Sequence, residues 1–166
     1  MPSDPVKVQY EKKRLWNEHR EKDCADFFTV GYSGRTIEIF IEALKGAGVQ
    51  CVIDVRHMPF SMYKPDFSRS NLQRHLSAVQ IDYIHMPDLG VPKDIRSKTI
   101  GHSDRAAIWQ WYDAHVAEKF CDNLHRFFNS ADHPVAFMCT EIDPTSCHRH
   151  RLALALEKNG LKGFDA

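Results

Sequence analysis

The sequence predicts an α/β fold: a three-layer sandwich with a mainly parallel central sheet and helices on both faces. Four short, nearly continuous apolar segments are typical of strands that are covered on both faces. Segments with apolar residues at helical spacing alternate with them, which is the order found in parallel sheets. We therefore expect a single α/β domain over residues 27–166, preceded by a charged N-terminal arm over residues 1–26 that docks through Trp16.

The apolar segments predict strands at residues 27–31, 51–56, 81–86 and 135–139. Helices are expected at residues 36–48, 68–79, 104–128 and 144–160. Residues suited to cap or end these helices are Thr36, Ser103 or Asp104, Asp143 and Gly160. A long loop over residues 87–104 separates the third strand from the third helix.

The composition is ordinary for a globular protein. Of the 166 residues, 43% are hydrophobic and 27% are charged, and 22 basic residues balance 22 acidic ones. Global charge therefore gives no argument for a nucleic-acid or membrane partner. No apolar run approaches the roughly 18 residues that cross a bilayer, and an odd number of cysteines without a leader pattern indicates reduced thiols. We expect a soluble, cytoplasmic protein.

Polar residues follow each of the four predicted strands. These clusters occupy residues 31–36, 54–57, 85–89 and 139–141. Ligands of open parallel sheets bind outside the carboxyl ends of the strands. The clusters therefore predict one shared cleft at this edge of the sheet.

Asp54 ends an apolar strand, where an ionised carboxylate needs partners or a raised pKa. Arg56 lies on the same side of the strand by alternation and is its candidate partner. One interpretation is a structural ion pair that organises loops. The other is a base that activates water, or a carboxylate that holds a substrate.

The turn at residues 31–36 carries Tyr32, Ser33 and Arg35 between two glycines. Free backbone N–H groups at the start of a helix favour an anion, and Arg35 adds positive charge. A tight turn that simply requires glycine explains the pattern equally well. The turn matches neither a P-loop nor a dinucleotide-binding motif.

The segment 137–156 combines two cysteines, one glutamate and two histidines around Pro144. The spacing of Cys139, Cys147 and His148 matches no usual zinc motif. Neighbouring residues of a helix point about 100° apart, so Cys147 and His148 would not easily share one ion. We therefore expect no metal and no other cofactor.

A nucleophilic thiol is an alternative for the same segment. A helix begun by Asp143 and the following proline would place Cys147 in its first turn, where the helix dipole lowers a thiol pKa. His148 or Arg149 would strengthen this effect. A buried cysteine that faces the sheet is an equally good interpretation. Glu141 is either an acid or an acceptor for backbone amides in the turn.

Basic residues around the expected cleft suit a phosphate-bearing ligand. Such a rim would comprise Arg35, Arg56, His148, Arg149 and Arg151, although helix arginines are ordinarily a solvated face. The long loop and the helix after it add Lys93, Arg96, Lys98, His102, Trp109, Trp111 and Tyr112. This mixture suits single-stranded nucleic acid or a flipped base, while core packing and a mobile lid are the alternatives.

Four segments resemble the successive motifs of the family catalogued as domain of unknown function 488. They are TVGYSGRTIEIFIEAL, VIDVRHMPFSMYKPDFS, IDYIHMPDLG and FMCTEIDPTSCHRHRLA, and the resemblance covers residues 27–158. The family's motif residues fall on Gly31, Tyr32, Ser33, Asp54, Arg56, Pro59, Phe67, Leu89, Gly90, Cys139, Glu141, Cys147, His148 and Arg149. The resemblance implies a three-layer α/β fold. A further short strand that many relatives carry after the last helix is expected to be shortened or absent here.

The resemblance also implies a nucleic-acid context, because some members of the family are linked to base excision of a modified pyrimidine. We therefore expect a DNA-binding, repair-type hydrolase with glycosylase-like activity, and nucleic acid or a phosphate-bearing ligand as its partner. The candidate catalytic residues are Asp54, Glu141 and Cys147. The candidate substrate-binding residues are Tyr32, Ser33, Arg35, Arg56, His57, Cys139, His148 and Arg149. Two alternatives stay open: sulfur or redox chemistry at Cys147 or Cys139 on a rhodanese-like sheet, and a non-catalytic domain that binds an anion or a partner.

Overall fold

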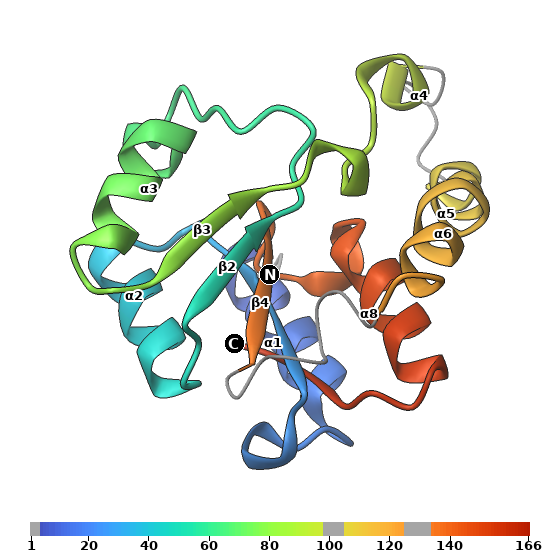
Figure 1. Ribbon diagram of the computed structural model, residues 1–166, viewed down its shortest axis with the longest axis horizontal. Helices are drawn as coiled ribbons and strands as arrows, with labels where there is room; N and C mark the ends of the chain where they lie inside the picture. The colour runs from blue at the N-terminus through green and yellow to red at the C-terminus, as the bar shows by residue number, and fades with distance from the viewer. Residues whose placement is uncertain (1–3, 98–104, 125–133) are drawn as a thin grey trace.

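The strands of the computed structural model form a five-stranded, all-parallel sheet in the order β3-β2-β4-β1-β5 (Figure 1). The structure describes residues 4–97, 105–124 and 134–166. The strands are β1 (Phe27–Gly31), β2 (Cys51–Asp54), β3 (Asp82–His85), β4 (Val135–Cys139) and β5 (Gly163–Asp165). The predicted α/β fold with a parallel central sheet is confirmed.

Helices connect the strands. Those among the described residues are α1 (Pro5–Asn17), α2 (Ile37–Gly46), α3 (Arg69–Ser77), α4 (Lys93–Ser97), α5 (Ala106–Tyr112), α6 (Glu118–Cys121) and α8 (Arg149–Lys158). Short 3₁₀ helices lie at Lys22–Cys24, Pro65–Phe67, Pro87–Leu89 and Pro144–Ser146. No helix in the described ranges is both long and apolar enough to span a membrane.

The long helix predicted at residues 104–128 differs from the observed structure. A π-helical turn, Asp113–Ala117, interrupts it between α5 and α6. Residue 104 and residues 125–128 lie outside the described residues, as do the loop residues Lys98 and His102. Apolar spacing alone does not distinguish one long helix from two helices joined by a π-turn.

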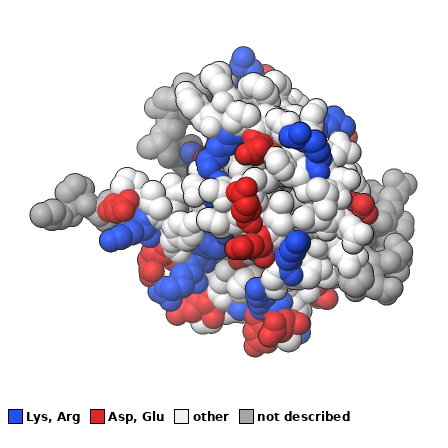
Figure 2. All heavy atoms as spheres, turned by 90° about the vertical axis from the view of Figure 1, so that its left-hand side faces the viewer, with Lys and Arg blue, Asp and Glu red and all other residues white. Residues whose placement is uncertain are grey.

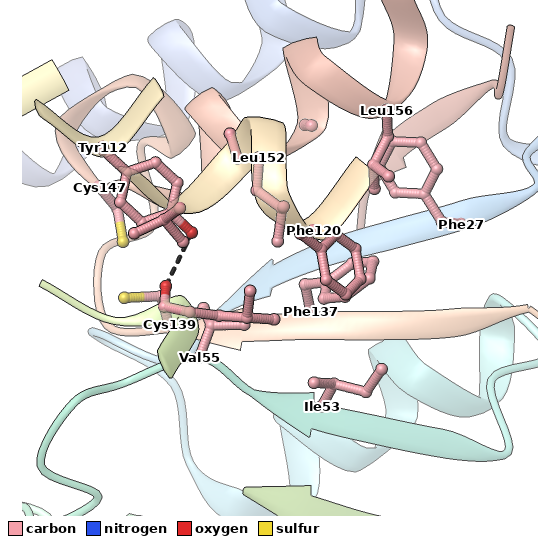
Figure 3. Packing of buried hydrophobic residues seen from close by; sticks show 14 of the residues in the cluster. Phe27, Ile53, Val55, Tyr112, Phe120, Phe137, Cys139, Cys147, Leu152 and Leu156 are labelled. Atoms are coloured by element: carbon pink, nitrogen blue, oxygen red, sulfur yellow. Dashed lines mark hydrogen bonds between the residues drawn. The ribbon is translucent and has the colours of Figure 1, made fainter. Parts of the chain in front are cut away.

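The sheet separates two hydrophobic clusters, because side chains alternate between its faces along each strand. On one face, Phe28 and Val30 of β1 pack with residues of α2 and α3, among them Phe40 and Leu72. On the opposite face, residues of β1, β2 and β4 pack with α5, α6 and α8 (Figure 3). Helices therefore cover both faces, which gives the three layers that the sequence predicts.

β4 is inserted between β1 and β2, although it follows β3 in the chain. Gly31 of β1 pairs with Cys139 of β4, and Asp54 of β2 pairs with Met138. The carboxyl ends of β1, β4 and β2 consequently lie side by side. This insertion places the polar cluster that follows β4 beside the clusters that follow β1 and β2, which lie more than 80 residues earlier in the chain.

The strand that was expected to be shortened or absent after the last helix is present as β5, which is three residues long. It pairs with β1 from Phe27–Gly163 to Thr29–Asp165. Glycine is required at position 163, since a Cβ there would lie 2.5 Å from the Phe27 ring. A strand of three residues that includes a charged one leaves no apolar run to detect in the sequence.

Asp165 anchors this end of the chain although its side chain is fully buried. Its carboxylate accepts hydrogen bonds from Thr29 Oγ1 at 2.6 Å and Lys13 Nζ at 2.5 Å, and pairs with Arg149 Nε at 3.2 Å. The Asn17 side-chain amide donates to the Asp165 backbone oxygen, and its Oδ1 accepts a hydrogen bond from the Asp165 backbone N–H. Trp16 packs against the core beside this contact, so helix α1 of the N-terminal arm is docked through residues 13–17.

Asp165→Asn tests this network. Loss of the charge leaves Arg149 buried and Lys13 largely buried without their anion, so we expect the free energy of unfolding to fall by about 3–5 kcal/mol. Urea unfolding at neutral pH measures the change. Glu42→Gln, on the exposed side of α2, is the matched control and should change stability by less than about 0.5 kcal/mol. Equal stability of the two variants would contradict the prediction.

The same carboxylate should make stability depend on pH. Burial raises the pKa of Asp165, but Arg149 and Lys13 outweigh burial and hold this pKa below its usual value. The ion pairs therefore stabilise the fold above the unfolded-state pKa of about 3.9, and this contribution is lost as pH falls through the lower folded-state pKa. We expect Tm to fall on acidification below about pH 4. Thermal unfolding from neutral to acid pH should show a smaller fall for Asp165→Asn.

Candidate active site

A cleft with a volume of about 680 Å³ lies at the carboxyl ends of β1, β4 and β2. Seven of the residues predicted for the site line it: Tyr32, Arg56, His57, Cys139, Glu141, Cys147 and His148. Asp54, Ser33, Arg35 and Arg149, which were predicted with them, do not line it. The sequence therefore locates the cleft correctly and assigns some neighbouring buried residues to it.

Cys139, Cys147 and His148 converge at the cleft. Cys139 ends β4, and Cys147 follows the 3₁₀ turn Pro144–Ser146. Nδ1 of His148 lies 3.8 Å from Cys139 Sγ and 3.9 Å from Cys147 Sγ. The two sulfur atoms face each other in Figure 3, beside the buried ring of Tyr112.

The prediction that Cys147 lies in the first turn of a helix is wrong. Asp143 caps the 3₁₀ turn as expected, accepting a hydrogen bond from the Thr145 backbone N–H at 2.9 Å. Cys147 itself has extended backbone angles, φ −128° and ψ 149°, and α8 begins only at Arg149. A 3₁₀ turn followed by one extended residue is not visible in a pattern that reads equally well as one helix.

The thiols and the imidazole shift one another's pKa values. Burial raises the pKa of Cys147, but its contacts with Cys139 and His148 outweigh burial and hold this pKa well below its usual value. The pKa of Cys139 is raised, first by its contact with Cys147 and then by burial. Burial lowers the pKa of His148, but Cys147 more than offsets it, so this pKa is raised.

Arg149 lies beneath the turn that follows β4, and its side chain is fully buried. Its guanidinium donates to the backbone oxygens of Glu141 and Ile142, the latter at 3.1 Å, and pairs with Asp165. It therefore fixes the path of the turn and is not exposed to a ligand in the cleft.

Glu141 is the carboxylate that the structure places in the cleft. Its side chain is half-buried, and within the described residues the carboxylate makes no hydrogen bond or ion pair. Burial raises the pKa of Glu141, and Cys147 adds to this effect, while Arg105 opposes it. A cleft-facing carboxylate without fixed partners is free to exchange a proton with a bound molecule.

Asp54 is fully buried, and both of its oxygens are occupied. Oδ1 accepts from the backbone N–H and Nε of Arg56, at 3.1 and 2.9 Å, and Oδ2 accepts from Arg56 Nη2 at 2.8 Å and Tyr83 OH at 2.5 Å. Arg56 also donates to the Phe67 backbone oxygen at 2.7 Å. The expected pairing of Asp54 and Arg56 is present, and its contacts favour the interpretation of a structural ion pair that organises loops.

The family model described as Domain of unknown function DUF488 matches residues 36–156, more than half of the chain. The chain belongs to this family. No curated protein and no solved structure is significantly similar to it. Family membership confirms the resemblance seen in the sequence, and it assigns no activity to any residue.

In this DUF488 protein, part of the expected basic rim lies elsewhere. Arg35 is buried, and its Nη2 donates to the Ala166 backbone oxygen at 3.1 Å. Arg151 pairs with Asp113 at the side of α8. Ser33 lies in the turn before α2, where its backbone N–H donates to the Thr140 oxygen at 2.8 Å. Arg56 and His148 remain in the cleft.

The DUF488 cleft also contains residues that sequence reasoning missed or left undecided. Phe60 and Met58 line its mouth and are 65% and 64% exposed. Arg105 lines it as well and donates to the Ser146 backbone oxygen. Trp109 of α5 completes the aromatic lining. The exposed apolar side chains after His57 were the available signal, because loops between strand and helix rarely expose several large apolar groups without a function.

Gly31→Ala tests how closely β1 must approach the turn of this DUF488 cleft. A Cβ at position 31 would lie 1.8 Å from the Glu141 backbone oxygen, a separation that atoms cannot adopt. We expect the free energy of unfolding to fall by about 3 kcal/mol, since neither backbone segment is free to move. Gly46→Ala is the control, because its Cβ would meet only Lys22 Nζ, at 3.5 Å. Urea unfolding should show no loss for this variant and a gain of up to about 1 kcal/mol.

Proposed function

We propose that this protein is a hydrolytic enzyme that cleaves the C–N bond between a nucleobase and its sugar, with Glu141 as general acid and base. The observation that carries the proposal is the position of Glu141. Glu141 lines the cleft, and its carboxylate has no hydrogen-bond or ion-pair partner among the described residues, whereas the Asp54 carboxylate is fully engaged by Arg56 and Tyr83. Of the two carboxylates that the sequence offers for catalysis, only Glu141 lies where it would meet a substrate.

The walls of the cleft support a substrate that is both anionic and planar. Arg105 presents an exposed guanidinium group, which is suited to bind phosphate oxygens. Phe60 and Trp109 present aromatic rings, which are suited to stack on a base. This combination fits a nucleotide better than it fits a purely apolar or purely anionic ligand.

Charge on the face that Figure 2 displays adds little to such binding. Figure 2 shows basic and acidic side chains interspersed on the face it displays, which matches the balanced composition. An extended nucleic acid held only by its phosphates needs a continuous basic surface. The proposal therefore assigns recognition to the cleft and to one or a few nucleotides.

The reaction needs one proton acceptor that later becomes a donor. Glu141 takes a proton from a water molecule as the water oxygen bonds to the anomeric carbon of the sugar. The C–N bond breaks, and its electron pair goes to the base nitrogen, which receives the proton from Glu141. The products are the free base and a sugar with a hydroxyl group, and Glu141 returns to its starting state.

Glu141→Gln and Asp54→Asn form a matched pair of tests, because each replaces a carboxylate by an amide of equal size. Oligonucleotides that contain uracil, 5-hydroxymethyluracil and other modified bases, together with free nucleotides, serve as substrates, and mass spectrometry detects the released base. We expect Glu141→Gln to lose at least about 100-fold in kcat with unchanged urea unfolding. Asp54→Asn should instead lose stability, by about 3 kcal/mol, since it leaves Arg56 buried without its anion.

Three results would count against the proposal. They are the absence of base release from every substrate, full activity of Glu141→Gln, and an equal loss of stability in both variants. A nucleotide that raises Tm without turnover would instead favour a non-catalytic binding domain.

Dithiol redox chemistry is a second candidate function, favoured by the proximity of Cys139 and Cys147. Their Sγ atoms lie within 4.8 Å of each other and line the cleft. Cys147 would attack an external disulfide and release one thiol, and Cys139 would then attack the mixed disulfide at Cys147 and release the second. The external disulfide is reduced to two thiols while the cysteine pair is oxidised. Intact mass after treatment with a small disulfide would show the loss of two hydrogens.

A further inference from the structure

We propose that Cys139, Cys147 and His148 bind a metal ion of the Zn²⁺ class in the cleft. Their ligand atoms lie within 4.8 Å of one another, although Cys139 ends β4 and the other two precede α8. All three residues line the cleft, so an ion held by them would be reached by a bound molecule. The inference rests on these three side chains and does not depend on the proposed hydrolysis.

The observed separations are close to those of a tetrahedral site. With Zn–S bonds of about 2.3 Å and Zn–N bonds of about 2.0–2.1 Å, tetrahedral angles place sulfur about 3.6 Å from nitrogen. Nδ1 of His148 lies 3.8 Å from Cys139 Sγ and 3.9 Å from Cys147 Sγ. Cys139 Sγ also lies 3.9 Å from Nε2, so it faces both ring nitrogens, and metal binding would require the Cys139 thiol to turn toward the Nδ1 lone pair.

A backbone contact holds the imidazole of His148 in place. Its Nε2 lies 2.9 Å from the backbone oxygen of Val55. A carbonyl oxygen only accepts, so Nε2 carries the proton and the lone pair of the neutral ring lies on Nδ1, the atom closest to both thiols. A histidine that donates its second N–H to a backbone carbonyl while the first nitrogen faces an ion is the usual arrangement of metal-binding histidines.

The sequence argument against a shared ion assumed that Cys147 and His148 both lie in a helix. Cys147 is extended instead, so the two neighbouring side chains do not diverge by the helical angle. The geometric argument for the absence of a metal, which was the divergence of these two side chains, therefore does not hold. The unusual spacing of the ligands follows from the fold, because one ligand comes from a strand end and two come from a turn.

The identity of the ligands favours zinc over magnesium or calcium. Two thiolates and an imidazole are soft or borderline ligands, whereas Mg²⁺ and Ca²⁺ prefer oxygen. Two thiolates also balance the charge of a divalent ion in a place where Cys139 and Cys147 are only 4% and 6% exposed.

Three protein ligands leave a fourth tetrahedral position open, as in catalytic zinc sites. Glu141 lines the same cleft without serving as a ligand. Two cysteines, one histidine and a glutamate outside the coordination sphere are the set of groups with which zinc enzymes hydrolyse C–N bonds of nucleobases. When bound, the ion would therefore supply activated water to Glu141.

Metal analysis of the purified full-length chain tests the proposal directly. We expect about one equivalent of zinc per chain, or tight uptake of one equivalent after treatment with a chelator. Replacement by Co²⁺ should give a thiolate-to-cobalt charge-transfer band and the visible bands of a tetrahedral site. Cys139→Ser, Cys147→Ser and His148→Gln should each lower the affinity at least about 100-fold. Cys51→Ser and Cys121→Ser, which alter thiols outside the cleft, are the matched controls and should bind as the wild type does.

The spectrum of the wild-type chain keeps the test decisive even where a cysteine variant fails to fold. Absence of a thiolate band with Co²⁺ overturns the proposal, as does metal binding that persists when both Cys139 and Cys147 are replaced. A Cys139–Cys147 disulfide that forms equally fast with and without zinc overturns it too and supports the redox function instead. Protection of both thiols from maleimide by zinc, reversed by a chelator, supports it.

The proposed metal site and the proposed hydrolysis can be contradicted by different results. If the metal-loaded chain releases no base, the proposed reaction is contradicted and the proposed metal site is not. If the chain binds no metal and still releases base, the proposed metal site is contradicted and the proposed reaction is not.

Discussion

The buried guanidinium of Arg149 is the interaction on which the cleft depends. It reaches two separate parts of the chain: the backbone oxygens of Glu141 and Ile142 in the turn after β4, and the Asp165 carboxylate in β5. A charge in this position would be costly if any of these partners were missing. The cleft turn, the last strand and, through Lys13, helix α1 are therefore stabilised together.

A second buried ion pair works in the same way on the other side of the cleft. Asp54 and Arg56 saturate each other at the end of β2, and the remaining donors of Arg56 reach the ring hydroxyl of Tyr32 and the backbone oxygen of Phe67. A buried ion pair can add little net stability, but removal of one partner is strongly destabilising because it leaves an uncompensated buried charge. In this fold, both pairs lie next to the cleft. Their arginines donate hydrogen bonds to backbone oxygens of the segments around it.

The sequence predicts correctly those features that depend on residues close together in the chain. Nearly continuous apolar runs mark β1, β2 and β4, and the polar residues that follow them identify the edge of the sheet where the cleft lies. It is less informative where a role depends on partners distant in the chain. Asp54 and Glu141 both follow an apolar strand in the sequence, yet Tyr83 and Arg56 enclose the first and nothing among the described residues encloses the second. No periodicity encodes that difference.

The neighbouring pair Cys147 and His148 shows how a single backbone conformation changes the available chemistry. In a continuous helix the two side chains would diverge, and Cys147 would act alone under the influence of the helix dipole. The 3₁₀ turn at Pro144–Ser146 and the extended Cys147 instead direct thiol and imidazole toward Cys139 at the end of β4. That convergence makes the three groups a single centre, for which we propose metal binding, with dithiol chemistry as the alternative. Because oxidation and metal binding both consume the same two thiolates, the two chemistries exclude each other in any one molecule.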